Sequence, residues 1–169
     1  CSQSRGLGDV YKRQADGNLE IVGEGDPDLS IAEIQRFAML ALGRGGSQSS
    51  ASTGAPLQLM LREEPPARWW PSDWPADDRS YAYGAPITRL ALTSNALHMA
   101  VMDPARRLER VLSTTVSQQG GSLRLVRVNP EQRQAALAQD RAAEPVVIHR
   151  ELSAPMHGLL SLANTESHN

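Results

Sequence analysis

The chain has 169 residues, of which 17 are lysine or arginine and 19 are aspartate or glutamate, giving a formal net charge of −2. This balance lacks the basic excess that is typical of proteins binding nucleic acid or anionic membranes. Aromatic residues make up only 4% of the chain, so its core must rest on aliphatic side chains, and no run approaches the ~20 apolar residues of a membrane-spanning helix.

Residues 1–14 differ in composition from the rest of the chain. The only cysteine is Cys1 and the only lysine is Lys12, whereas arginine is plentiful from Ala15 onward. The run SRGLGDVYKRQ resembles an in-frame translation of a transposase adapter used in DNA sequencing. We therefore predict that residues 1–14 derive from such an adapter. The absence of cysteine from residues 15–169 excludes disulfides and thiolate metal sites there.

Residues 15–43 predict a strand followed by a helix, with the strand at 18–22. Ser30 and Glu33 have the spacing of a capping box, in which each side chain satisfies a backbone N–H group at the start of a helix. Apolar residues then recur at helical spacing up to a glycine that predicts the helix end: Ile31, Ile34, Phe37, Ala38, Leu42 and Gly43.

The middle of the chain is less regular. Residues 44–56 are rich in glycine and serine, which predicts a linker or a mobile loop. Within residues 57–103 we expect strands at 57–61 and 87–93, joined by a segment whose five prolines exclude regular structure. The stretch 94–102 fits a short helix and a strand equally well.

Residues 104–169 predict an α-β-β-α unit. Asp103 and Pro104 are typical of a helix start, and a glycine pair ends that helix before a strand at 122–128. The polar segment after it is compatible with a helix, and a second strand and a last helix follow at 146–150 and 153–165. The fold class is therefore α+β. Because the last helix needs a sheet to cover, we expect the unit to be truncated at its C-terminus.

The candidate metal ligands and catalytic groups are histidines and acidic residues. His149 and His157, with Glu151, could form a metal site, but no established metal-binding spacing is present. We predict that these two residues, like His98 and His168, are surface or half-buried histidines. Alternating acids after the first strand (Glu24, Asp26 and Asp28) superficially resemble a calcium loop, but they lack its remaining ligand positions. We therefore predict no metal site and no cofactor.

The proline-rich segment carries Trp69, Trp70 and Trp74 beside three acidic residues, Asp73, Asp77 and Asp78. Tryptophans with carboxylates could form a sugar-hydrolysing site, but glycosidase carboxylates need rigid elements that this segment lacks. We predict instead that the indole rings dock on the chain's own core or on a protein partner, and the three tryptophans are our candidate interaction residues.

Residues 107–169 resemble the periplasmic domains of type II secretion protein M and of type IV pilus inner-membrane alignment proteins. The resemblance is carried by RLERVLSTTVSQQGGSLRLVRVNP and by VVIHRELSAPMHGLLSLANTES. It implies a ferredoxin-like fold with a closing strand, and a dimer that scaffolds an assembly platform without catalysis. It also implies a periplasm-facing protein, for which an N-terminal membrane anchor would precede the present chain.

Together these observations predict a non-enzymatic bacterial module for protein–protein interaction or assembly, with protein partners that include a second copy of the chain. The alternative is a small metal- or carboxylate-dependent hydrolase that uses His149 and His157 or the Asp73–Asp78 loop. Histidines and acids that converge in one pocket would favour the enzyme. Scattered histidines and an unpaired apolar sheet edge would favour the module.

Overall fold

The computed structural model describes residues 8–13, 19–26, 29–45, 56–139, 146–152 and 161. The strands are β1 (Gly8–Arg13), β2 (Leu19–Val22), β3 (Leu57–Arg62), β4 (Leu123–Val128) and β5 (Val146–Leu152). The α-helices are α1 (Ile31–Gly45), α2 (Pro104–Gln118) and α3 (Pro130–Gln139). This mixture of helices with a small, partly parallel sheet confirms the α+β prediction.

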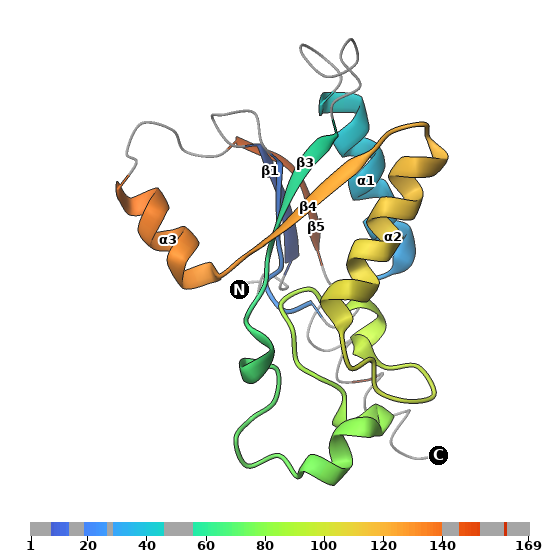
Figure 1. Ribbon diagram of the computed structural model, residues 1–169, viewed down its shortest axis with the longest axis vertical. Helices are drawn as coiled ribbons and strands as arrows, with labels where there is room; N and C mark the ends of the chain where they lie inside the picture. Colours follow the sequence, from blue (N-terminus) through green and yellow to red (C-terminus); the bar gives the residue numbers. More distant parts are fainter. Residues whose placement is uncertain are drawn as a thin grey trace.

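The five strands form one sheet in the order β4-β3-β2-β1-β5. Strands β2, β3 and β4 run parallel, and β1 is antiparallel to both of its neighbours. Helices α1 and α2 connect the parallel strands and lie together on one face, whereas α3 lies on the other side of the sheet (Figure 1). The predicted α-β-β-α unit is thus spread across the sheet, because three strands separate β4 from β5.

Part of the segment predicted to derive from an adapter contributes a strand to this sheet. Residues Gly8–Arg13 form β1, in which Val10 pairs with Val22 of β2 and with Arg150 of β5. The remaining predicted units, 15–43, 57–103 and 104–169, also supply strands to the same sheet. The adapter origin of residues 1–14 stays a prediction, which reading the codons of the gene would test.

Helix α1 begins at the predicted capping box. The backbone N–H of Glu33 donates to Ser30 Oγ at 3.2 Å, and the N–H of Ser30 donates to Glu33 Oε2 at 2.6 Å. These bonds satisfy two N–H groups that helix geometry leaves without partners. The helix continues to Gly45, two residues beyond the predicted end at Gly43.

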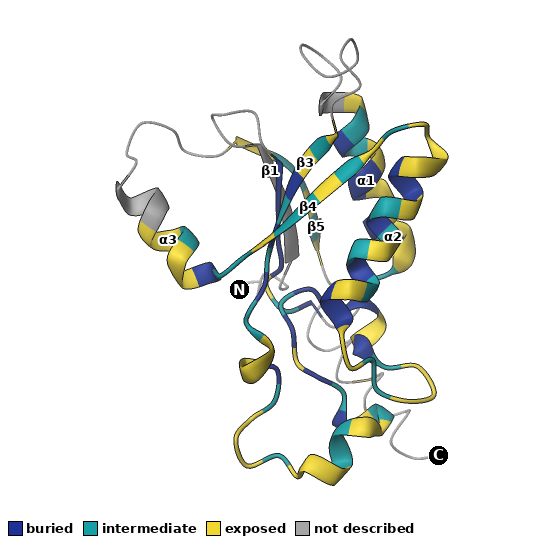
Figure 2. Cartoon of the chain, in the orientation of Figure 1, coloured by how far each residue is buried: buried dark blue, intermediate teal, exposed yellow. Residues whose placement is uncertain are grey.

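The hydrophobic core lies between the sheet and the pair α1 and α2, where buried residues line the facing surfaces (Figure 2). Alternate residues of the strands point into it, so that Leu59 and Leu61 of β3 are 1% exposed whereas Gln58 is exposed. This alternation follows from the two-residue period of a strand. Each helix adds a stripe at helical spacing: Ile34, Phe37, Ala38 and Ala41 from α1, and Leu108, Leu112 and Val116 from α2.

Helix α2 has the predicted N-terminal cap. Asp103 Oδ1 accepts from the backbone N–H of Arg106 at 2.9 Å, and Pro104 occupies the first turn. The helix ends before Gly120, whose φ of 76° is a left-handed conformation that glycine adopts without steric cost. Both ends of α2 therefore follow from local sequence signals.

Residues between β3 and α2 form an irregular segment with four short 3₁₀ turns, at Pro66–Arg68, Ala76–Ser80, Ala82–Gly84 and Leu92–Asn95. The proline-rich part was predicted to be irregular. The prediction of a strand at 87–93 was wrong. Within this stretch only Leu90 makes a β-bridge, with Asp26, and the chain then turns at Thr93, where φ is 50°. Hydrogen bonds that the Glu63 carboxylate accepts from the backbone N–H groups of Arg89 and Leu90 hold this segment, as described below.

Several predicted features lie outside the described residues, namely the glycine- and serine-rich stretch from residue 46 to 55 and the last helix at 153–165 apart from Ser161. The polar segment after β4 is helical as α3, which begins after Asn129 Oδ1 accepts from the N–H of Glu131 at 2.9 Å. Among the described residues, no helix combines the length and the apolar character needed to cross a membrane.

Candidate functional site

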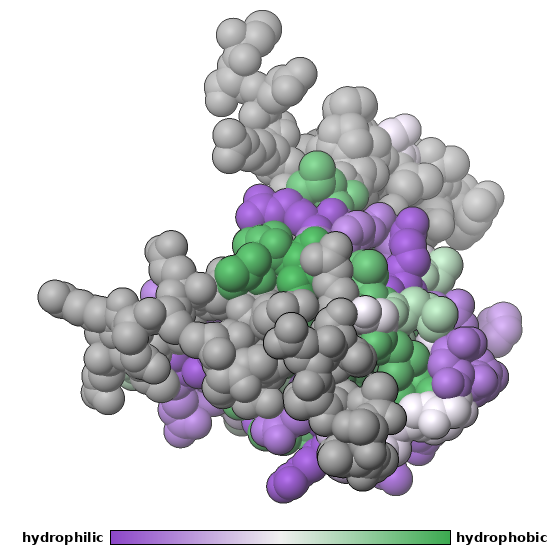
Figure 3. All heavy atoms as spheres, turned by 90° about the horizontal axis from the view of Figure 1, so that it is seen from above, coloured by the Kyte–Doolittle hydropathy of each residue, from purple (hydrophilic) through white to green (hydrophobic). Residues whose placement is uncertain are grey.

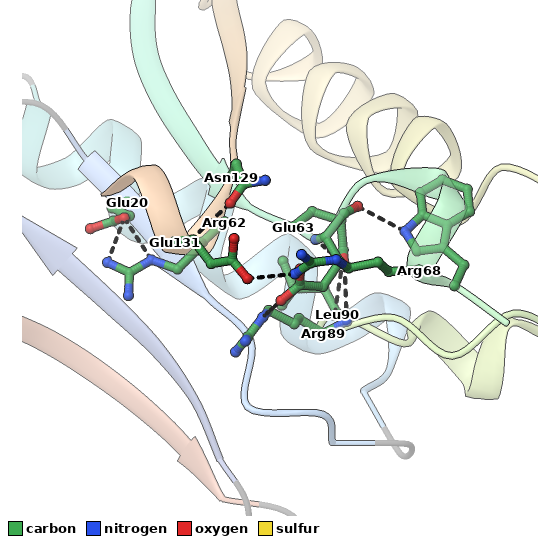
Figure 4. A network of polar contacts seen from close by, with 10 residues as sticks. Glu20, Arg62, Glu63, Arg68, Arg89, Leu90, Asn129 and Glu131 are labelled. Atoms are coloured by element: carbon green, nitrogen blue, oxygen red, sulfur yellow. Dashed lines mark hydrogen bonds and ion pairs between the residues drawn. The ribbon is translucent and has the colours of Figure 1, made fainter. Parts of the chain in front are cut away.

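The carboxyl ends of β3 and β4 carry a network of polar contacts centred on Glu63 (Figure 4). Glu63 is 7% exposed, and its Oε1 accepts from the N–H groups of Glu64 at 2.8 Å and of Arg89 at 3.1 Å. Its Oε2 accepts from the N–H of Leu90 at 3.4 Å. Burial raises the pKa of the Glu63 carboxyl and outweighs the opposite effect of these N–H donors. The carboxylate thus ties the segment around Leu90 to the end of β3.

Ion pairs surround this carboxylate and extend to α3. Glu64 contacts Arg89 at 2.9 Å and Arg68 at 3.5 Å, and Arg68 contacts Glu131 of α3 at 2.6 Å (Figure 4). A cavity of about 200 Å³ adjoins the network. Ligands of open parallel sheets commonly bind at this end of the strands. Here, however, the charged groups are engaged with one another, so the arrangement indicates a structural joint.

A second buried charge lies on the face of the sheet opposite α1 and α2. Glu20 of β2 is fully buried, and its Oε1 accepts from Arg62 Nη2 at 2.9 Å and from Arg62 Nε at 3.1 Å. Arg133 Nε of α3 lies 3.5 Å from the same oxygen. Because an ionised carboxylate is costly to bury without cations, these two arginines hold Glu20 and link α3 to the sheet.

The third region is β5, the edge strand beside α1. His149 Nε2 lies 2.9 Å from Glu151 Oε2, and the imidazole ring packs edge-on against Phe37 with ring centroids 5.8 Å apart. Arg36 Nη2 of α1 lies 3.3 Å from Glu151 Oε1. An open hollow of about 460 Å³ lies between α1 and β5. It is lined by Arg36, Met39, Leu40, Gly43 and His149.

Apolar side chains are exposed along β5. Val146, Val147 and Leu152 are 66%, 47% and 63% exposed. β1 is the only described strand that pairs with β5, so the outer edge of β5 carries no described strand partner. Seen from the end of the molecule where β5 begins, hydrophobic side chains reach the surface between hydrophilic ones (Figure 3).

The three candidate interaction tryptophans lie in the irregular segment after β3. Trp69 is 3% exposed, and its Nε1 donates to Glu64 O at 2.9 Å, so this ring docks on the chain's own fold. Trp70 is half-buried, and its Nε1 donates to Gly84 O at 2.9 Å. Trp74 is also half-buried. Of the two outcomes left open by the sequence, Trp69 therefore shows docking on its own core.

The structure does not gather the candidate catalytic residues. His98 is exposed, whereas His157 and His168 lie outside the described residues. Asp73 and Asp77 are exposed, and Asp78 Oδ1 accepts from the hydroxyl of Tyr83 at 3.0 Å. Within the described ranges, no three histidine, cysteine, aspartate or glutamate side chains form a group that could hold a metal ion.

Asp26, which belongs to the stretch that resembles a calcium loop, is buried and forms the bridge to Leu90. Asp28 lies outside the described residues. Glu20 and Glu63 are not among the residues predicted from the sequence. Glu20 is the one charged residue among the apolar residues of β2, and Glu63 directly follows β3. A charged residue within an apolar strand, or directly after one, can therefore indicate a buried ion pair or a buried carboxylate that accepts backbone hydrogen bonds.

No protein-family model matches the chain, and no curated protein matches it in sequence.

Proposed function

We propose that the chain is a non-enzymatic protein-interaction module that joins a second copy of itself through the outer edge of β5. The observation that carries the proposal is the exposure of Val146, Val147 and Leu152 along a strand that pairs on one side only among the described residues. Unpaired backbone groups beside exposed apolar side chains favour the addition of another strand.

The other edge strand of the sheet, β4, exposes charged rather than apolar side chains, which favours pairing at β5. In β4 the exposed side chains are Arg124 and Arg127, and edge strands that avoid pairing are commonly protected by such charges. In β5 the exposed side chains are the same three apolar residues and Arg150. Strand addition is therefore expected at β5 rather than at β4.

Antiparallel pairing of two β5 strands would relate the copies by a twofold axis perpendicular to the sheet. Because such an axis keeps both copies of α1 on the same face, the two hollows beside β5 would flank the seam. Met39 of α1 is 46% exposed at this hollow and would add apolar contact between the helices. The contact would then exceed that of two isolated strands.

The finer part of the proposal is that this dimer belongs to a bacterial secretion or pilus assembly platform, in a periplasm-facing position. It is supported by the resemblance of residues 107–169 alone. Of the two segments that carry this resemblance, the second includes β5, VVIHREL, the strand assigned here to pairing.

Sedimentation equilibrium tests the dimer. Wild type is expected to show a concentration-dependent monomer–dimer equilibrium, and Val147→Lys is expected to weaken it by about tenfold or more, because a charge would be placed in the seam. The matched control is Ile87→Lys, since Ile87 is 62% exposed but lies in the segment after β3. A wild type that stays monomeric, or a control that weakens association equally, would refute the proposal.

A hydrolase remains the second candidate because of one observation, the His149–Glu151 contact of 2.9 Å beside the hollow. In such an enzyme Glu151 would orient His149 as a general base. The test is a panel of carboxylic and phosphoric esters: an activity that His149→Ala abolishes, and that Arg150→Ala leaves intact, would favour the enzyme over the module.

A further inference from the structure

The irregular segment after β3 presents a second cluster of exposed apolar side chains, at the carboxyl end of the parallel strands. We define the tyrosine–methionine patch as Tyr81, Tyr83, Leu97 and Met99, which are 48%, 67%, 61% and 50% exposed. Contiguous exposed patches of this kind mark interaction sites more often than single apolar residues do. Tyrosine and methionine are also enriched at protein interfaces.

The patch is held in place by contacts within the segment. The rings of Tyr81 and Tyr83 stack with centroids 5.4 Å apart and an interplanar angle of 5°. Tyr81 forms a β-bridge with Met99, and the N–H of Ala100 donates to Ser80 O at 3.0 Å. A tight turn in which the N–H of Leu97 donates to Met99 O at 3.0 Å presents the last two members. The two tyrosine rings are therefore pre-organised, which lowers the entropic cost of binding.

The same segment packs closely on itself around Trp70 and Gly84. Trp70 Nε1 donates to Gly84 O at 2.9 Å, and the guanidinium of Arg79 lies 5.3 Å from the Trp70 ring. At Gly84 a Cβ atom would lie 1.8 Å from Asp78 O, so only glycine allows this approach. Arg79 Nη2 also donates to Trp74 O at 3.4 Å.

Acidic residues adjoin the tyrosine part of the patch, and the exposed His98 lies between its other two members. Asp77 and Asp78 lie in the 3₁₀ turn Ala76–Ser80, and Asp78 Oδ1 accepts from the Tyr83 hydroxyl at 3.0 Å. Asp77 is exposed and Asp78 is half-buried, whereas Arg79 of the same turn packs on Trp70. A partner that covers the tyrosine rings would therefore meet negative charge at their border.

We propose that the tyrosine–methionine patch binds an amphipathic segment of another protein that carries lysine or arginine beside apolar residues. The apolar side chains would cover the stacked rings, and the cations would face Asp77 and Asp78. Charge complementarity of this kind selects the partner and speeds association, whereas the buried aromatic centre carries most of the affinity. This surface is separate from the outer edge of β5, so the two proposals stand independently.

The test uses the full chain and fluorescence anisotropy of labelled model peptides made of leucine and lysine, with two matched peptides: one with glutamate for lysine and one with serine for leucine. The leucine–lysine peptide is expected to bind about tenfold more tightly than either. Met99→Ser and Tyr83→Ser are each expected to weaken its binding by about tenfold. Ile87→Ser, an exposed apolar residue outside the patch, is expected to leave binding unchanged.

Circular dichroism of each variant separates loss of the patch from loss of the fold, and Tyr83→Phe keeps the ring while removing the hydroxyl contact with Asp78. Equal binding of the lysine and glutamate peptides would overturn the charge assignment. Equal weakening by Ile87→Ser, or unchanged binding by folded Met99→Ser and Tyr83→Ser, would overturn the assignment of the patch.

Discussion

Replacing Arg62 by methionine is expected to lower the free energy of unfolding by about 3 kcal/mol, because it removes the two hydrogen bonds that Arg62 donates to a buried carboxylate. Glu20 is fully buried, and Arg62 donates to it at 2.9 Å and 3.1 Å. Arg133 Nε lies 3.5 Å from the same carboxylate oxygen but is not hydrogen-bonded to it. Urea unfolding of the two proteins measures the difference.

The double variant Glu20→Leu/Arg62→Met shows whether the loss comes from the buried charge. It is expected to recover part of the stability, because the buried carboxylate is removed together with Arg62, although Arg133 then loses its ionic partner. The matched control is Arg36→Met, which removes an exposed pair with Glu151 and should cost less than about 1 kcal/mol. A double variant as unstable as Arg62→Met alone would contradict this account of Glu20.

Glu63→Ala is the second large effect, with an expected loss of about 3 kcal/mol. The substitution leaves the N–H groups of Glu64, Arg89 and Leu90 without the carboxylate that binds them. A buried donor left without an acceptor costs about 1–3 kcal/mol. Thermal unfolding measures the loss, and Asp73→Ala, at an exposed aspartate in the segment after β3, is the control. Equal effects of the two substitutions would show that the hydrogen bonds to Glu63 do not stabilise the segment around Leu90.

The raised pKa of Glu63 determines how its contribution to stability changes with pH. Because burial raises its pKa in the folded state, the folded state binds the proton more tightly than the unfolded state. The contribution of Glu63 to the free energy of unfolding is therefore present below the pKa that Glu63 has in the unfolded state. This contribution is lost as pH rises through the pKa that Glu63 has in the folded state. Relative to Glu63→Gln, wild type should therefore gain stability as pH falls from neutral toward the ordinary glutamate range. A relative gain on raising the pH would show that the N–H donors dominate instead.

Helices α1 and α2 could be predicted from sequence because their signals are local. The capping pair Ser30 and Glu33 lies within one turn, and Asp103 is adjacent to the helix that it caps. Their buried stripes repeat at a fixed spacing, so periodicity identifies them without knowledge of the partner surface. The α+β class followed from these elements and from the short apolar runs between them.

The order of the strands could not be predicted, because it depends on contacts between distant residues. Nothing near β5 in the sequence indicates that it pairs with β1, and the separation of β4 from β5 follows from that pairing. The alternating residues from Ile87 to Thr93 were interpreted as a strand for a related reason. This segment is held by hydrogen bonds to the Glu63 carboxylate, and its side chains alternate between polar and apolar although it pairs with no strand.

The surroundings of the candidate interaction residues could not be predicted, for the same reason. The sequence marks the three tryptophans as candidates, but only the structure distinguishes Trp69, which packs on its own fold, from the half-buried Trp70 and Trp74. The role of β5 as an edge depends on its single described neighbour, which the sequence does not reveal. Similarly, the stacking of Tyr81 on Tyr83 depends on the path of the irregular segment.

Amide hydrogen exchange of Val146–Leu152 at low and high protein concentration tests the central claim that the outer edge of β5 pairs with a second copy. At high concentration, the outward-facing N–H groups of β5 would become hydrogen-bonded in the continuous sheet, so their exchange should slow, whereas exchange in β4 should not change. If the chain dimerises while exchange in β5 stays constant, the seam lies elsewhere and the account of this edge is wrong.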